Sequence, residues 1–133
     1  MNCPKCKSRM ENLAVEGIGV ERCSNCHGMW FDLLGIESLA KKKAAAQLDT
    51  GAVEVGLKYN KIREIDCPKC NTRMTKMSDK DLPELAYEKC PVCYGVWLDA
   101  GEFRLYRRRG WLHSFKRLFR RPTPSTSLDD QTL

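Results

Sequence analysis

All eight cysteines of this 133-residue chain fall into four Cys-x-x-Cys pairs, with none left over. The pairs form two sets: 16 residues separate the pairs of the first set, and 19 separate those of the second. Two such pairs about 15–20 residues apart are typical of a zinc site, because each tight turn supplies two thiolates and two turns complete a tetrahedron. We therefore predict two bound Zn²⁺ ions. Their ligands are Cys3, Cys6, Cys23 and Cys26 in the first set, and Cys67, Cys70, Cys90 and Cys93 in the second.

A shell of four thiolates leaves no open coordination position, so we expect both metals to be structural rather than catalytic. The main alternative is a dithiol redox protein, which typically has one Cys-x-x-Cys near a βαβ pattern, and that pattern is missing from this sequence. His27 could replace Cys26 as a ligand, but the second set has Tyr94 at the matching position. A zinc deaminase needs a His-x-Glu motif, which neither His27 nor His113 provides.

The residues around the turns predict how the thiolate charge is offset. Gly28 and Gly95 each follow a second turn, where a backbone with positive φ costs glycine little. We expect backbone N–H groups to point at the sulfurs. We also expect three lysines to add to this effect: Lys5, Lys69 and Lys89.

The two cysteine sets belong to an internal repeat, which aligns residues 3–39 with residues 67–106. The longer inner gap of the second unit predicts a hairpin of variable length, with residues 80–83 at the longer tip. Each unit has one tryptophan, Trp30 or Trp97, four residues after its last cysteine. Small ribbons have little apolar bulk, so we interpret both tryptophans as core residues.

An acid follows each tryptophan by two positions and is expected to start a helix. In the second unit Asp99 and Glu102 form a D-x-x-E capping box, with Leu98 and Phe103 as a hydrophobic staple. In the first unit the box around Asp32 is imperfect, although the staple recurs. Capping accounts for these carboxylates more simply than a catalytic role does.

The pattern C-P-x-C…C-x-x-C-x-G-x-W-[FL]-D…E, present at residues 3–37 and again at 67–103, resembles the TFIIB-type zinc-ribbon (transcription factor zinc-finger) family. This family occurs as single or tandem units in small bacterial proteins. The resemblance implies the ribbon fold and the same eight cysteine ligands. Its name suggests transcription, but a shared ribbon fold does not establish a shared function.

The expected fold is a small, metal-stabilised α+β protein with two zinc ribbons, each followed by a helix. Residues 1–34 form the first ribbon and 66–103 the second. Between them, residues 35–48 are rich in helix formers and predict one helix, whereas 52–59 read equally as strand or linker. A basic amphipathic helix over 104–121 and a disordered tail over 122–133 complete the chain.

The basic segment carries most of the net charge of +6. Residues 104–128 contain no acid, and the eight cations there exceed that net charge, so the rest of the chain is at 6 − 8 = −2. Each Zn(Cys)₄ centre adds about −2, because metal binding releases the thiol protons. One apolar stripe of a helix would hold Trp111, Leu112, Phe115, Leu118 and Phe119.

This segment is the expected binding element of a non-catalytic zinc protein. Nucleic acid or a nucleoprotein complex is the leading partner, because clustered cations neutralise phosphates. The alternatives are an acidic protein partner, the acidic body of the same chain and an anionic membrane surface, and a solvated charged helix is the plainest reading. We expect no small-molecule substrate, and the lack of a secretory signal predicts a cytoplasmic protein. The binding residues would be Arg107, Arg108, Arg109, Trp111, Phe115, Lys116, Arg117, Arg120 and Arg121.

Overall fold

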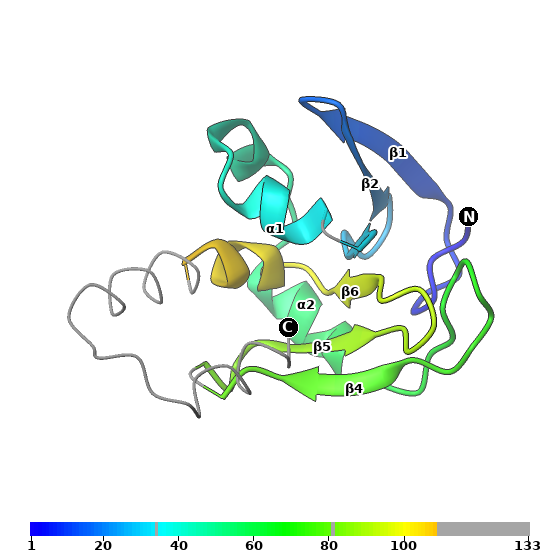
Figure 1. Cartoon of the computed structure of the whole chain (residues 1–133). Coiled ribbons are helices and arrows are strands. Elements are labelled where there is room, and N and C mark those ends of the chain that lie inside the picture. Colours follow the sequence, from blue (N-terminus) through cyan, green and yellow to red (C-terminus); the bar gives the residue numbers. More distant parts are fainter. Residues whose placement is uncertain (34, 81, 109–133) are drawn as a thin grey trace, which may run out of the picture.

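The computed structural model describes residues 1–33, 35–80 and 82–108. Its centre is one six-stranded antiparallel sheet in the order β1-β2-β3-β6-β5-β4 (Figure 1). The first repeat supplies β1 (Met10–Val15), β2 (Ile18–Cys23) and β3 (Met29–Phe31). The second repeat supplies β4 (Thr75–Ser78), β5 (Ala86–Lys89) and β6 (Val96–Leu98). Each ribbon is therefore half of a shared sheet.

The two halves meet at the third strand of each repeat. β3 and β6 pair antiparallel, with Trp30 directly opposite Trp97 and Met29 opposite Leu98. An approximate two-fold axis therefore passes between the tryptophans and exchanges the two repeats. The sequence repeat predicted two ribbons but did not indicate that they share a sheet.

The hairpin tips differ as the unequal cysteine gaps predict. β1 and β2 are joined by Glu16 and Gly17 alone, with φ values of 50° and 82°. Positive φ at both central residues is the type I′ turn that suits a two-residue hairpin. β4 and β5 are joined by the longer stretch 79–85. The variable hairpin is confirmed.

The segment between the ribbons is helical, but it is not the single helix predicted over 35–48. It contains α1 (Gly35–Ala40), a 3-10 helix η1 (Lys43–Gln47) and α2 (Val53–Asn60). In a continuous helix, Lys43 would lie on the same face as Ile36, seven residues earlier. Because Ile36 is buried, Lys43 would then be buried too. The break resets the phase, so that Ala45 is buried and Lys43 is exposed. The stretch 52–59, left open between strand and linker, lies almost entirely in α2.

Alternation along the central strands divides the core into two parts, one for each face of the sheet. On one face Met29, Phe31, Val96 and Leu98 pack under the helices. Residues 102–108 form a further helix there, and Phe103 stacks on Phe31 with ring centroids 5.0 Å apart. The helix after the second repeat therefore packs on a strand of the first. The predicted basic helix and tail lie mostly beyond residue 108, outside the described residues.

Candidate metal centres and their junction

All four Cys-x-x-Cys turns have the same backbone geometry. The N–H of the residue after each pair donates to the carbonyl of the first cysteine, at 2.9–3.2 Å. That following residue has φ between 57° and 67° in every turn. The four residues are Lys7, His27, Asn71 and Tyr94.

Backbone N–H groups point at the sulfurs as predicted. In each Cys-x-x-Cys turn, the Sγ of the first cysteine accepts two backbone hydrogen bonds. The donors are the N–H groups of the third residue of the turn and of the second cysteine. The eight N–H···S distances are 3.3–3.4 Å. These donors stabilise the thiolate form of four of the eight cysteines, which is the form that binds metal.

Each set of four cysteines brings its sulfurs together, with all four Sγ atoms within 4.8 Å of one another. The Sγ–Sγ distance is 3.6 Å for Cys3–Cys26 and 3.4 Å for Cys6–Cys23. A tetrahedral zinc with Zn–S bonds of about 2.3 Å requires sulfurs about 3.8 Å apart. Donor type, number and spacing all fit Zn²⁺, so each set is a structural zinc site.

A hydrogen bond between two sulfurs of the first site also favours the thiolate form of Cys3. The Cys26 thiol donates to the Cys3 sulfur, which lowers the pKa of Cys3 to about 5 and raises the pKa of Cys26. Zinc replaces such shared protons, so its affinity falls as the pH is lowered.

The glycines after the second turns have a different role from the one predicted. The positive φ falls on His27 and Tyr94, one residue earlier, and neither Gly28 nor Gly95 adopts it. A Cβ on Gly28 would lie 2.3 Å from Cζ2 of Trp97, and a Cβ on Gly95 would lie 2.1 Å from Cζ2 of Trp30. Each glycine thus makes room for the tryptophan of the other repeat. Both tryptophans are fully buried, as predicted.

The comparisons with known proteins agree with this geometry. Residues 2–42 and 66–106 each match the transcription factor zinc-finger family, of the TFIIB zinc-ribbon type. The chain belongs to this family. Its two zinc-finger repeats cover well over half of the sequence. No curated protein and no solved structure matches the chain.

A lysine from the first zinc finger connects the two repeats. The Lys5 ammonium lies 2.9 Å from Glu88 Oε1 and 3.0 Å from Asp99 Oδ2, and all three side chains are buried. It also donates to the carbonyl of Tyr59 at the end of α2. The sequence predicted that Lys5 would offset the charge of the thiolates. Instead, Lys5 forms ion pairs with two acids of the second repeat.

The matching lysine of the second zinc finger has the same kind of partner in a different environment. Lys69 pairs with Asp32, the counterpart of Asp99, and both side chains are about half exposed. This pairing raises the pKa of Lys69. Lys89 lies over the ring of Tyr94, 5.7 Å from its centroid. The difference between the two halves arises because α2 covers only the Lys5 side.

Burial shapes the protonation of the acids around Lys5. Desolvation raises the pKa of Glu88 and Asp99, although Lys5 opposes the shift. Lys5 supplies one positive charge for two carboxylates. Arg63 supplies a second one, because it donates to Glu88 Oε2 at 2.8 Å. Burial, together with the nearby charges of Asp99 and Glu88, raises the pKa of Glu102 to about 9. It is therefore a neutral carboxylic acid at pH 7.

The capping box predicted at Asp99 is only half formed. Glu102 Oε1 accepts from the Asp99 N–H at 2.7 Å, as the box requires. The Asp99 carboxylate, however, accepts from Trp97 Nε1 at 3.1 Å and from Lys5 instead of capping the helix. Because Asp99 is buried beside Lys5, the ion pair competes successfully with the cap.

Asp49 caps this helix instead, a role that the sequence did not indicate. Its carboxylate accepts from the N–H groups of Gly101 at 2.9 Å and Arg104 at 3.1 Å. The partners are 52 and 55 residues apart in sequence. No local pattern could reveal the role, because Asp49-Thr50-Gly51 reads only as the end of a preceding helix.

The described arginines of the basic segment are partly used within the fold. Arg104 donates to the carbonyls of Asp49 and Gly51. Arg107 donates to the carbonyls of Ala40 and Lys42, and Arg108 is exposed. The remaining predicted binding residues lie outside the described residues: Arg109, Trp111, Phe115, Lys116, Arg117, Arg120 and Arg121.

Proposed function

We propose that this zinc-binding protein contacts nucleic acid or a nucleoprotein complex through its Arg-rich C-terminal segment. The observation that carries the proposal is the uninterrupted positive charge after Phe103, attached to a scaffold made rigid by two zinc sites. Clustered Lys and Arg side chains bind the phosphate backbone and release its counterions, whatever the base sequence.

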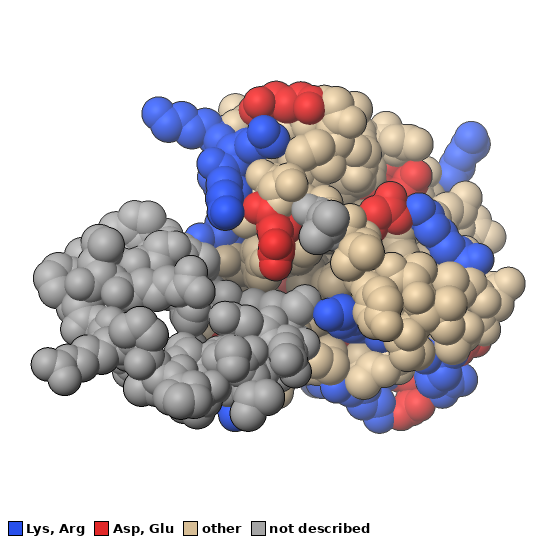
Figure 2. Space-filling view, in the orientation of Figure 1, with Lys and Arg blue, Asp and Glu red and all other residues tan. Residues whose placement is uncertain are grey.

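A second group of cations lies where this segment begins. Arg107 is bound to the carbonyl of Lys42, which places it beside the linker sequence Lys41-Lys42-Lys43. The side chains of Lys41 and Lys43 are exposed. Figure 2 shows several Lys and Arg side chains beside the place of α1 in Figure 1, next to acidic side chains. The proposed phosphate-binding surface therefore includes residues from both repeats' helical extensions.

The metal centres contribute rigidity rather than chemistry to this function. Four thiolates close each zinc shell, so no position is open for a substrate or water. We accordingly propose a binding role without catalysis, in a reducing compartment such as the cytoplasm, where thiolate ligands stay reduced.

Salt-dependent binding tests the proposal. The zinc-loaded chain is titrated with fluorescent single-stranded RNA and duplex DNA at several salt concentrations. Electrostatic binding predicts that log K falls linearly with log salt, by about 0.9 per neutralised phosphate on a duplex and about 0.7 on a single strand. Binding that is absent, or that does not depend on salt, contradicts the proposal.

Charge-matched variants locate the surface. Lys41→Gln/Lys43→Gln and Arg117→Gln/Arg120→Gln should each lower the duplex slope by up to ~2. Lys58→Gln/Lys61→Gln removes the same charge from exposed positions at the end of α2 and should leave the slope unchanged. An equal loss in all three variants would show that net charge alone drives binding.

The membrane alternative has its own measurement. Among the described residues, no helix has the length and apolar character needed to cross a membrane. Peripheral attachment is measured by sedimentation with vesicles containing anionic lipid. Binding to vesicles that is stronger than to nucleic acid, and that is lost in Trp111→Ala/Phe115→Ala, would favour this alternative.

A further inference from the structure

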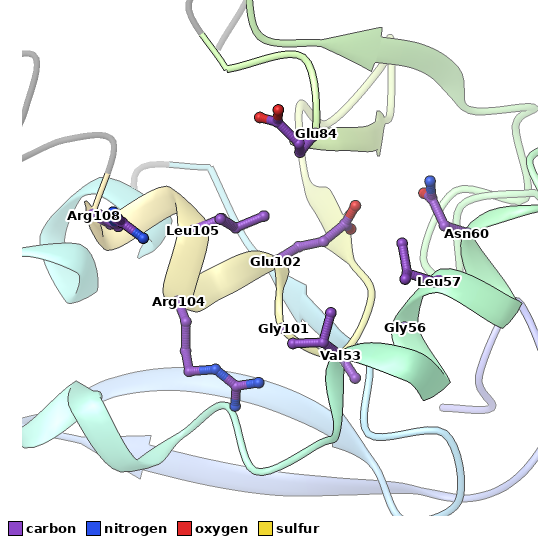
Figure 3. A pocket seen from close by; sticks show the side chains of 11 residues that line it. Val53, Gly56, Leu57, Asn60, Glu84, Gly101, Glu102, Arg104, Leu105 and Arg108 are labelled. Atoms are coloured by element: carbon purple, nitrogen blue, oxygen red, sulfur yellow. The ribbon is translucent and has the colours of Figure 1, made fainter.

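A cavity of about 390 Å³ lies between α2 and the helix formed by residues 102–108. Its apolar walls come from Val53 and Leu57 on one side and Leu105 on the other. Figure 3 shows these two helices on either side of the cavity, with the Glu102 side chain extending between them. Val53 is 52% exposed and Leu57 is 63% exposed. Apolar side chains that remain this accessible beside a cavity are typical of a surface that another group covers.

The wall of the cavity also contains a carboxyl group. Glu102 is only 6% exposed, and its Oε1 accepts from the Asp99 N–H. Glu102 also lines the cavity. Covering a polar group without a hydrogen bond is costly, so an occupant that can hydrogen-bond to this carboxyl group is favoured over a purely apolar one.

We propose that this cavity is the binding site of Trp111, which anchors the C-terminal segment of the same chain. The described chain ends at Arg108, which itself lines the cavity. Trp111 is the first apolar residue beyond it, and Gly110 between them allows the chain to leave the helix axis and turn back. The occupant is therefore already tethered within three residues of the site.

The chemistry of the indole matches both features of the cavity. Its ring covers Val53, Leu57 and Leu105, and its N–H donates to the carboxyl group of Glu102. Buried tryptophans usually need such an acceptor for the indole N–H. The protein uses the same pairing once already, since Trp97 Nε1 donates to the Asp99 carboxylate.

Docking of Trp111 would turn the apolar stripe of the segment toward the body and its arginines toward solvent. The inference concerns the free protein and does not depend on nucleic-acid binding. It can therefore succeed or fail independently of the function proposed above.

The test uses the full-length, zinc-loaded chain labelled with 5-fluorotryptophan. The chain has three tryptophans, so three ¹⁹F signals are expected, and Trp111→Phe identifies the signal of interest. The change in shift between H₂O and D₂O reports solvent access to each ring. Trp30 and Trp97, both at most 1% exposed, serve as internal references for a shielded ring.

Two exposed leucines give a matched pair of variants. Leu57→Glu places a charge in the cavity wall, whereas Leu33→Glu makes the same change at a residue that is 56% exposed and does not line the cavity. Unchanged Trp30 and Trp97 signals and two bound zinc ions per chain verify that both variants fold.

The expected result is a Trp111 signal as shielded as the references, with shielding lost in Leu57→Glu and kept in Leu33→Glu. A solvent-exposed Trp111 in the wild-type chain would overturn the inference. Shielding that survives Leu57→Glu would overturn it too, because Trp111 would then be covered elsewhere. Shielding that disappears on dilution would identify a second copy of the chain as the cover and would equally refute docking within one chain.

Discussion

Lys5 and Lys69 occupy the same position in two identical Cys-Pro-Lys-Cys turns, yet replacing them should have very different costs. The Lys5 ammonium is fully buried and contacts Glu88 and Asp99 at 2.9 and 3.0 Å. At an effective dielectric constant of about 20, each contact contributes roughly 5–6 kcal/mol of Coulomb attraction, which desolvation largely offsets. Removing one partner of a buried ion pair typically costs ~3–5 kcal/mol, because the remaining charge stays buried.

Lys5→Met should therefore lower the free energy of unfolding by ~3–5 kcal/mol. Lys69→Met removes a half-exposed pair with Asp32 and should cost less than about 1 kcal/mol. Urea unfolding of the zinc-loaded chains, followed by circular dichroism, measures both values. Bound zinc is quantified in parallel, so that any loss of metal is not mistaken for loss of the ion pair.

A double variant tests whether the unpaired acid is the cause. Lys5→Met/Asp99→Asn removes one charge of each sign and leaves Glu88 with Arg63, which donates to it at 2.8 Å. This variant should be more stable than Lys5→Met alone. Equal losses for Lys5→Met and Lys69→Met, or a double variant no better than the single one, would refute the burial argument.

Four further predictions concern Gly28, Asp49, Glu102 and the bound zinc. Gly28→Ala should cost at least ~1–3 kcal/mol, since its Cβ would meet a tryptophan ring, whereas Gly19→Ala has nothing within 4 Å and should cost under ~1 kcal/mol; equal thermal shifts would contradict this. Asp49→Ala should cost ~0.5–2 kcal/mol in urea unfolding, and normal stability would show that the long-range cap is dispensable. Folding raises the pKa of Glu102 from an ordinary 4.5 to about 9, so the stability that its proton supplies is complete below pH 4.5 and is lost as the pH rises to 9, by up to ~1.4 kcal/mol per unit. Glu102→Gln should remove this slope, so wild type and variant should diverge between pH 7 and 9, and parallel curves would count against the shift. Chelation should release two zinc ions per chain and unfold both halves of the shared sheet together, and a native circular dichroism spectrum after zinc removal would disprove it.

The zinc sites were predictable because their geometry is local. A Cys-x-x-Cys turn is built from adjacent residues, and its N–H···S bonds span only two or three positions. The sequence repeat then predicts two equivalent sites, and the hairpin gap predicts which tip is longer. The buried tryptophans follow from the same repeat.

Predictions failed where residues distant in sequence compete for the same group. The helix expected over 35–48 breaks because burial of Ala45 outweighs helix propensity. Only half of the capping box forms, because Lys5, 94 residues away, binds the Asp99 carboxylate. Gly28 was interpreted by its backbone freedom, but the tryptophan of the other repeat requires its missing side chain.

The sequence by itself determined the metal, its eight ligands and the repetition of the ribbon, since contiguous residues specify each turn. Only the tertiary structure decided that the two ribbons share one sheet and exchange their tryptophans across its centre. It also decided which of two identical lysines is buried. α2 covers one side of the approximate two-fold axis and excludes water from the ion pairs of Lys5. The Lys69 pair lies on the other side and stays at the surface.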